Sequence, residues 1–187
     1  RIAMDEWNYW SRPYYYGDLG CIYRMRDALG IAIGLHEFFR NSDIIAMANY
    51  AQTVNVIGAI KTTKTAACFS AAALPLVLYR HHFGRIPVKT SCGEPVDAMA
   101  ALSEDKTTLT VGVVNPVDRQ VRVVLSISGK KPSTAATCWQ IAADPMAYNR
   151  PGEKPAVEIE KHELRLVNGS FRVPPHSITV LELPLVH

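Results

Sequence analysis

The chain has 187 residues, of which 48% are hydrophobic and 20% are charged, and its formal net charge is +3. This balance is typical of a globular protein that buries a core, and the small net charge does not favour nucleic acid or an acidic membrane surface as a partner. No apolar run reaches the ~18 residues that a membrane span needs. The chain opens at Arg1 inside an apolar segment, without an initiator methionine, which we interpret as a truncated or cleaved polypeptide.

The first half of the chain alternates between predicted strands and helices. Residues 2–4 are a short apolar strand that ends at Asp5 and Glu6, and a loop rich in Tyr, Gly and Pro follows. Apolar residues at helical spacing predict a helix over residues 23–40. The further predicted elements are a helix at 43–52, a buried strand at 54–60 and a helix at 69–83. This alternation is typical of a parallel α/β fold, and two such units cannot bury a parallel sheet alone.

The second half of the chain is predicted to contain strands only. Apolar and polar residues alternate in it with the period of half-buried strands, and Pro and Gly mark the turns. Residues 144–156 are predicted to form a long surface loop. The clearest strands lie at residues 109–113, 121–127 and 178–183. We therefore expect two domains: residues 1–86 with the α/β pattern and residues 87–187 as an antiparallel β-sandwich.

Glu6 is the first candidate for chemistry, because it ends a short parallel-type strand, the edge that carries the active site in α/β barrels. Aromatic residues surround it in the sequence, and more follow in the loop at 14–16. Aromatic faces can stack on sugar rings, and a carboxylate can attack an oxocarbenium-like carbon. The alternative is that these aromatic residues only pack the rim of the fold. The composition alone favours that alternative.

Five segments stand out in order along almost the whole chain: DEWNYW at residues 5–10, DALGIA at 27–32, SDIIAMANYAQTVNVI at 42–57, VNP at 114–116 and PPHSITVL at 174–181. These segments resemble motifs of glycoside hydrolase family 51, the α-L-arabinofuranosidases. The stretch at 42–57 is long and is the most specific of them.

This resemblance implies the C-terminal end of a (β/α)8 barrel, its last two βα units, followed by a β-sandwich. It also implies a retaining mechanism in which Glu6 is the nucleophile. The general acid/base would be the glutamate of an Asn-Glu pair at the end of the fourth barrel strand, outside residues 1–187. The isolated chain is therefore predicted to be inactive. The implied partners are an arabinofuranoside substrate and the missing N-terminal barrel segment, carried by the same polypeptide or by a second chain, in a homo-oligomer.

The candidate substrate contacts are Trp7, Asn8, Trp10 and Ser70. Trp7 and Trp10 are candidates for the rim or the pocket, and Asn8 for hydrogen bonds within the loop. Ser70 stands where many family members carry a glutamine that reaches the arabinose, which leaves the sugar specificity open. Asp5 is expected to be structural, because side chains alternate along a strand and Asp5 would then point away from Glu6.

Neither a metal nor a cofactor is expected. The six histidines are scattered without zinc-ligand spacing, and no cysteine lies in a C-x-x-C pair. We interpret the cysteines as buried thiols, with disulfides left open. These cysteines are Cys21, Cys68, Cys92 and Cys138.

The leading hypothesis is an exo-acting α-L-arabinofuranosidase that acts on hemicellulose or arabino-oligosaccharides. The first alternative is an endo-acting glucanase or xylanase on the same scaffold, for which the Ser70 substitution leaves room. The second alternative belongs to another class, a non-catalytic carbohydrate-binding β-sandwich fragment. The residues themselves do not indicate a cellular compartment, because any targeting signal would lie upstream.

Overall fold

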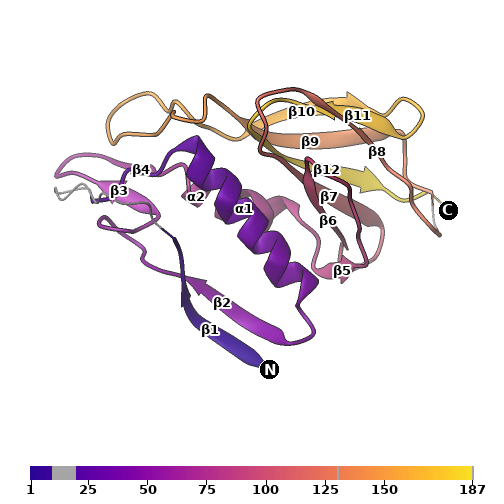
Figure 1. Cartoon of the computed structure of the whole chain (residues 1–187), viewed down its shortest axis with the longest axis horizontal. Coiled ribbons are helices and arrows are strands. Elements are labelled where there is room, and N and C mark those ends of the chain that lie inside the picture. The colour runs from indigo at the N-terminus through magenta and orange to yellow at the C-terminus, as the bar shows by residue number, and fades with distance from the viewer. Residues whose placement is uncertain (10–19, 130, 187) are drawn as a thin grey trace. The chain divides into compact units, whose positions relative to one another are not determined.

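The structure is a computed structural model that describes residues 1–9, 20–129 and 131–186. Within these residues the chain is mostly β-structure, with the helices α1 (Met25–Arg40) and α2 (Ala73–His82) (Figure 1). Both helices fall where helical periodicity predicts them. No helix of the described residues is long and apolar enough to cross a lipid bilayer.

The chain divides into two compact units, each of which combines two separate stretches of sequence. The first unit consists of residues 1–76 and 143–158, and the second unit consists of residues 77–142 and 159–187. The sequence pattern instead places a single boundary between residues 86 and 87.

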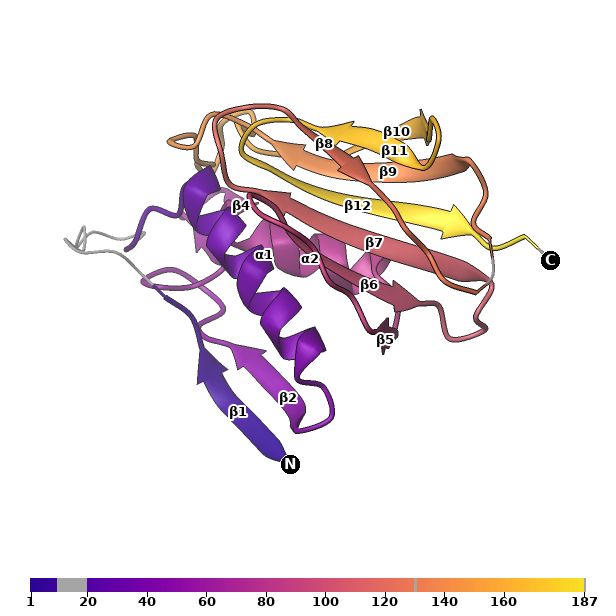
Figure 2. The same cartoon turned by 45° about the vertical axis from the view of Figure 1, so that its right-hand side comes forward.

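The first unit is built on two parallel strands that are joined by a helix. β1 (Ile2–Trp7) pairs in parallel with β2 (Ile45–Tyr50), and α1 connects them. Figure 2 shows α1 running alongside the two strands. An antiparallel hairpin of β3 (Ile60–Thr62) and β4 (Ala67–Phe69) follows. This β–α–β connection is the usual way to join parallel neighbours.

Local sequence fixes both ends of α1. The carboxylate of Asp27 accepts a hydrogen bond from the backbone N–H of Arg24 at 2.7 Å, which closes the first turn. At the other end, the Asn41 side chain donates to the Glu37 carbonyl at 2.8 Å. The apolar face repeats at three- and four-residue spacing and is buried. It comprises Met25, Ala28, Leu29, Ile31 and Ala32.

Two predicted elements of this unit are wrong. The predicted helix at 43–52 is instead the strand β2 with its flanking turns. A segment this short fits helical and strand periods alike, and pairing with β1 decides between them. The predicted strand at 54–60 is mostly turns, because Asn55 and Val56 adopt left-handed φ angles of 51° and 47°. Only its last residue enters a strand, β3.

The second unit confirms the predicted antiparallel β-structure. A six-stranded sheet has the order β10-β9-β12-β7-β6-β5, and β8 pairs with β11 in a separate two-stranded sheet. Aliphatic side chains from both sheets form one core. The strands are β5 (Ile86–Val88), β6 (Asp97–Leu102), β7 (Thr108–Asn115), β8 (Val121–Val124), β9 (Ala135–Ala142), β10 (Glu160–Arg165), β11 (Ser170–Val173) and β12 (Ser177–Pro184).

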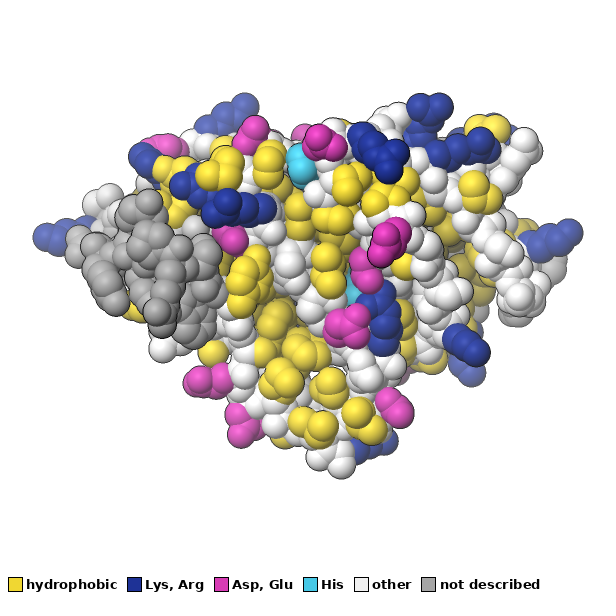
Figure 3. Space-filling model, viewed as in Figure 1, with side chains coloured by type: hydrophobic (Ala, Val, Ile, Leu, Met, Phe, Trp, Pro, Cys, Tyr) yellow, Lys and Arg dark blue, Asp and Glu magenta, His cyan; other side chains and the backbone are white. Residues whose placement is uncertain are grey.

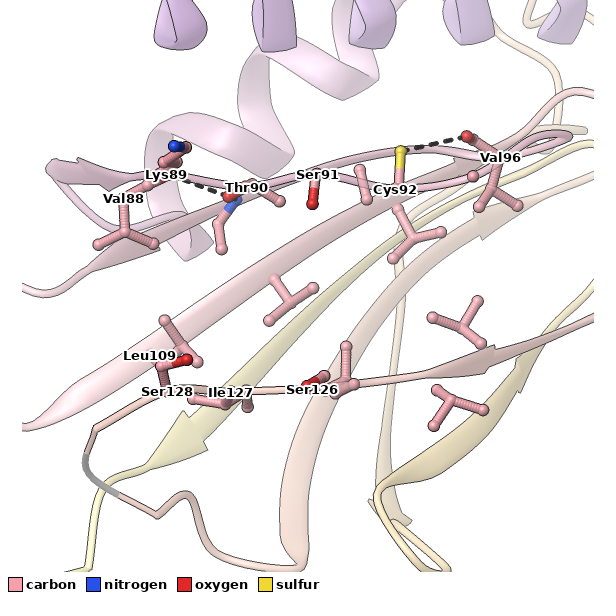
Figure 4. A pocket seen from close by; sticks show the side chains of 18 of the residues that line it. Val88, Lys89, Thr90, Ser91, Cys92, Val96, Leu109, Ser126, Ile127 and Ser128 are labelled. Carbon is pink, nitrogen blue, oxygen red and sulfur yellow. Dashed lines mark hydrogen bonds between the residues drawn. The ribbon is translucent and has the colours of Figure 1, made fainter.

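A cavity of about 1010 Å³ lies within the second unit, between β6, β7 and β8 and the segment that leads from β5 to β6. Figure 4 shows Val88 and Thr90 on one side of it and Leu109 and Ile127 on the other. The described residues that line it are mainly aliphatic and include no aromatic side chain.

Candidate active site

Glu6 lies in an irregular part of β1. Met4 pairs with Ala48 and Trp7 pairs with Tyr50, so β1 advances three residues while β2 advances two. Such a bulge re-aims side chains, and bulges are frequent beside active sites. The alternation predicted to turn Asp5 away from Glu6 is interrupted here, and both carboxylates are exposed. Glu6 thus has an accessible carboxylate at the C-terminal end of a parallel strand.

Trp7 packs toward α1. Its ring meets Phe38 edge-to-face at 4.9 Å between centroids and Tyr50 at 5.5 Å. It also contacts the cluster that includes Tyr23 and Ile31. The indole therefore anchors the end of β1 on the helix. In this unit Trp7 supports the strand that carries Glu6, whereas the sequence proposes it as a substrate contact.

Asn8 joins the end of β1 to the chain that follows β2. Its Nδ2 donates to the Ala51 carbonyl at 2.7 Å, to the Tyr23 hydroxyl at 2.8 Å and to the Ile57 carbonyl at 3.0 Å. Tyr23 in turn donates to the Ile57 carbonyl at 3.0 Å. These bonds use both amide hydrogens, so Asn8 holds the loop in place, as the sequence suggests for it.

Tyr9 ties the residues after β1 to the beginning of α1. Its hydroxyl lies 3.1 Å from the carbonyl oxygen of Asp27 and 3.3 Å from the Asp27 carboxylate. Burial raises the pKa of Tyr9, and the negative charge of Asp27 raises it further. A Cβ atom at Gly30 would stand 2.8 Å from the Tyr9 hydroxyl, so glycine is required there for this contact.

Ser70 is buried, with 2% of its surface exposed, just before α2. Its backbone N–H donates to the Ala59 carbonyl at 2.8 Å, and its carbonyl accepts from Ala73 at 3.0 Å. Among the described residues, its Oγ has no hydrogen-bond partner. A buried hydroxyl without a partner is unusual, so this one is suited to bind a water molecule or a ligand oxygen.

The stretch at 143–158, which contains the surface loop predicted at 144–156, belongs to the first unit. Met25 at the start of α1 donates its backbone N–H to the Ala147 carbonyl at 2.9 Å. Asn149 donates from Nδ2 to the Phe69 carbonyl at 3.1 Å, next to Ser70. The loop thereby covers the helix start and the β3–β4 hairpin.

The sequence did not point to two polar side chains that hydrogen-bond the residues just after Glu6. These are Tyr23, which bonds Asn8, and Asp27, which bonds Tyr9. Asp27 could have been found, because an acidic residue three positions after a helix start is a capping signal. Nothing in the sequence marks Tyr23. The candidate Trp10 and the tyrosines at 14–16 lie outside the described residues.

An exposed glutamate at the C-terminal end of a parallel strand lies at the edge where the active sites of (β/α) barrels are found. The profile of the alpha-L-arabinofuranosidase C-terminal domain family matches residues 5–177. The chain belongs to this family.

Individual relatives agree with this assignment. A probable alpha-L-arabinofuranosidase C of Aspergillus niger is 31% identical over 98% of this chain and 40% of its own length. An intracellular exo-alpha-(1->5)-L-arabinofuranosidase 1 of Bacillus subtilis is 25% identical over 98% of this chain and 40% of its own length. The chain thus spans about two fifths of these relatives.

Solved structures show the same likeness. The arabinose complex of the Thermotoga maritima alpha-L-arabinofuranosidase aligns with a TM-score of 0.87 and 28% identity over 99% of this chain and 43% of that chain. A bifunctional glucanase-xylanase from a metagenome library aligns with a TM-score of 0.63 and 21% identity over 88% of this chain and 29% of that chain. The second likeness concerns the fold alone.

Proposed function

We propose that residues 1–187 are the C-terminal part of a retaining α-L-arabinofuranosidase and that Glu6 is its nucleophile. The observation that carries this proposal is the exposed Glu6 carboxylate in the bulge at the end of β1, in a chain of this family. In this reading β1 and β2 are the last two strands of a (β/α)8 barrel. Active sites of such barrels lie at the carboxyl ends of the strands.

The proposed reaction proceeds in two displacement steps. A protonated glutamate from the preceding part of the polypeptide gives its proton to the leaving oxygen, while Glu6 attacks the anomeric carbon. Water then enters, loses a proton to the same acid/base residue and releases arabinose with retained configuration. The exposed, accessible carboxylate of Glu6 suits the nucleophile, which must be ionised to attack.

The apolar surface of β1 and β2 supports a missing barrel segment as the partner. Ile2, Ile44 and Met47 are each nearly half exposed. Figure 3 shows hydrophobic side chains gathered at the lower end of the view, where Figure 1 places these two strands. Parallel sheets are normally covered on both faces. We propose that further barrel strands, from the same polypeptide or from a second chain, cover this surface.

The substitution test uses the full-length polypeptide that carries residues 1–187. We expect Glu6→Ala to lower kcat on an aryl arabinofuranoside by about 10⁴-fold, because the first displacement loses its nucleophile. Asp5→Asn is the matched control, since it removes the adjacent exposed carboxylate; it should retain activity within about tenfold. Normal turnover by Glu6→Ala would exclude Glu6 as the nucleophile.

Ser70 keeps an endo-acting glucanase or xylanase as the second candidate, because its short side chain is buried where many members of the family carry a sugar-contacting glutamine. A panel of aryl glycosides and polymers separates the two activities. We expect cleavage of nitrophenyl arabinofuranoside and no cleavage of cellulose or unsubstituted xylan. The reverse result would favour the endo-acting enzyme.

A further inference from the structure

Lys61 is a buried cation in the first unit. Its side chain lies on β3 with 4% of the residue exposed, and its Nζ donates to the Val56 carbonyl at 3.1 Å. The same Nζ lies 5.3 Å from the centre of the Tyr23 ring. Lysine is rarely buried in this way unless its ammonium group is compensated. Its position therefore calls for an explanation.

The carbonyl that Lys61 contacts belongs to the least regular part of the loop. Val56 has a φ of 47°, a left-handed angle that is exceptional for a β-branched residue. Its carbonyl accepts two hydrogen bonds, from Lys61 Nζ at 3.1 Å and from the Cys21 backbone N–H at 2.6 Å. A strained conformation persists only where its surroundings hold it, and these two donors hold Val56.

The loop is hydrogen-bonded to Asn8, two residues after the candidate nucleophile. Ile57, the next residue, presents its carbonyl to Asn8 Nδ2 at 3.0 Å and to the Tyr23 hydroxyl at 3.0 Å. Asn8 stands two residues after Glu6 in the chain. A continuous path of contacts thus runs from the Lys61 ammonium through the Val56–Ile57 backbone and Asn8 to the end of β1.

We propose that Lys61 is a positioning residue for the reaction at Glu6: its ammonium fixes the Val56 carbonyl, and the loop so held places Asn8 and the Glu6 carboxylate. This inference rests on the proposed function. Lys61 acts through the loop and needs no contact with the sugar. Small displacements of a reacting group lower the rate steeply, by ~10²-fold for ~1 Å.

Two thiols flank the ammonium and report on its charge. Cys68 is the cross-strand partner of Lys61, and Cys21 shares the Val56 carbonyl with it. Burial raises the pKa of both thiols, and the charge of Lys61 opposes that rise. Burial lowers the pKa of Lys61, because for a lysine the charged form is the protonated one.

The decisive variants are Lys61→Met and Lys61→Arg in the full-length polypeptide. Methionine keeps the apolar stem and removes the charge, whereas arginine keeps a cation. We expect Lys61→Met to lower kcat between about 10- and 100-fold with KM nearly unchanged, and Lys61→Arg to retain most of the activity. The melting temperature of Lys61→Met should fall by a few degrees, because the Val56 carbonyl then keeps only the Cys21 donor, while the protein stays folded at the assay temperature.

Three controls make the result interpretable. Lys64→Met removes an exposed lysine of the same hairpin and should change nothing. The alkylation rates of Cys21 and Cys68 should fall in Lys61→Met, while that of the exposed Cys92 stays constant. Glu6→Ala tests the proposed function separately.

Unchanged kcat in Lys61→Met beside an inactive Glu6→Ala would overturn the role of Lys61 and leave the proposed function intact. Equal losses of activity in the arginine and methionine variants would also overturn the role of Lys61. So would a loss of activity in Lys61→Met that is explained by the fraction of the protein that is unfolded.

Discussion

At the scale of single residues, polar side chains of the first unit hold the end of β1 in place by hydrogen bonds. Asn8 bonds two carbonyls of the loop after β2, and Tyr9 bonds Asp27 at the start of α1. Glu6 lies within β1, just before these anchors, and stays exposed. Support by fixed neighbours, with the reacting group left accessible, is the arrangement that positions a catalytic side chain.

Cys138 gives a prediction for the dependence of stability on pH. It is 1% exposed on β9, and burial raises the pKa of its thiol to about 12. The unfolded thiol loses its proton near its ordinary pKa of ~8.5. Stability is therefore fully present below that pH and declines by up to about 1.4 kcal/mol per pH unit as the pH rises toward 12.

We expect Cys138→Ala to flatten this alkaline loss, whatever its effect on stability at neutral pH. Urea unfolding at about pH 8 and about pH 10 measures the difference. Cys92→Ala, at an exposed cysteine, is the control and should keep the slope of the unsubstituted protein. Identical slopes in all three proteins would mean that Cys138 does not titrate with folding.

At the scale of elements, we expect alanine substitutions at two glycines of α1 to change the stability in opposite directions. A Cβ at Gly30 would lie 2.8 Å from the Tyr9 hydroxyl, whereas a Cβ at Gly34 would lie 3.4 Å from the Trp7 ring, an ordinary contact. Gly34→Ala should stabilise the protein by up to ~1 kcal/mol through helix propensity. Gly30→Ala should destabilise it by about 1 kcal/mol, because Tyr9 has to move and loses its hydrogen bonds to Asp27.

Thermal melts of the two variants measured side by side check this pair. The two substitutions are chemically identical and lie on one helix, so a difference in sign reports on Tyr9 and Trp7 rather than on helix propensity. Equal stabilisation by both would show that Tyr9 does not pack over Gly30 as described.

The local sequence predicts a helix or a strand correctly where the apolar residues follow only the helical or only the strand period. The long apolar face of α1 and the alternation of β7 and β12 are predicted correctly for this reason. β2 is missed because six residues rich in Ala and Met satisfy both periods, and a neighbour distant in sequence chooses between them. The loop at 54–60 is missed because Lys61 holds the carbonyl of the left-handed Val56 and Asn8 holds that of Ile57, contacts that no local pattern shows.

At the scale of the whole molecule, segments far apart in the sequence agree on one family. The family match extends from residue 5 to residue 177, across both compact units. The candidate nucleophile follows from the first strand and the resemblance together. The contacts of Tyr23 with Ile57 and Lys61, and those of the loop at 143–158, follow only from the structure, because they join residues far apart in the sequence.

The proposal also predicts that residues 1–187 alone are inactive, since a retaining glycosidase needs two carboxylates and the acid/base residue is proposed to lie elsewhere in the polypeptide. Release of nitrophenol from the aryl arabinofuranoside, compared between the isolated chain and the full-length polypeptide, tests this. Comparable activity in both would place the acid/base within this chain.

The central claim is that Glu6 forms the covalent bond to the sugar. The most direct measurement is peptide mass spectrometry of the full-length polypeptide after reaction with an arabinofuranosyl donor whose enzyme adduct hydrolyses slowly. The account predicts one arabinosyl ester on Glu6, which disappears in the Glu6→Ala variant. An ester on a different carboxylate of the active protein would contradict it.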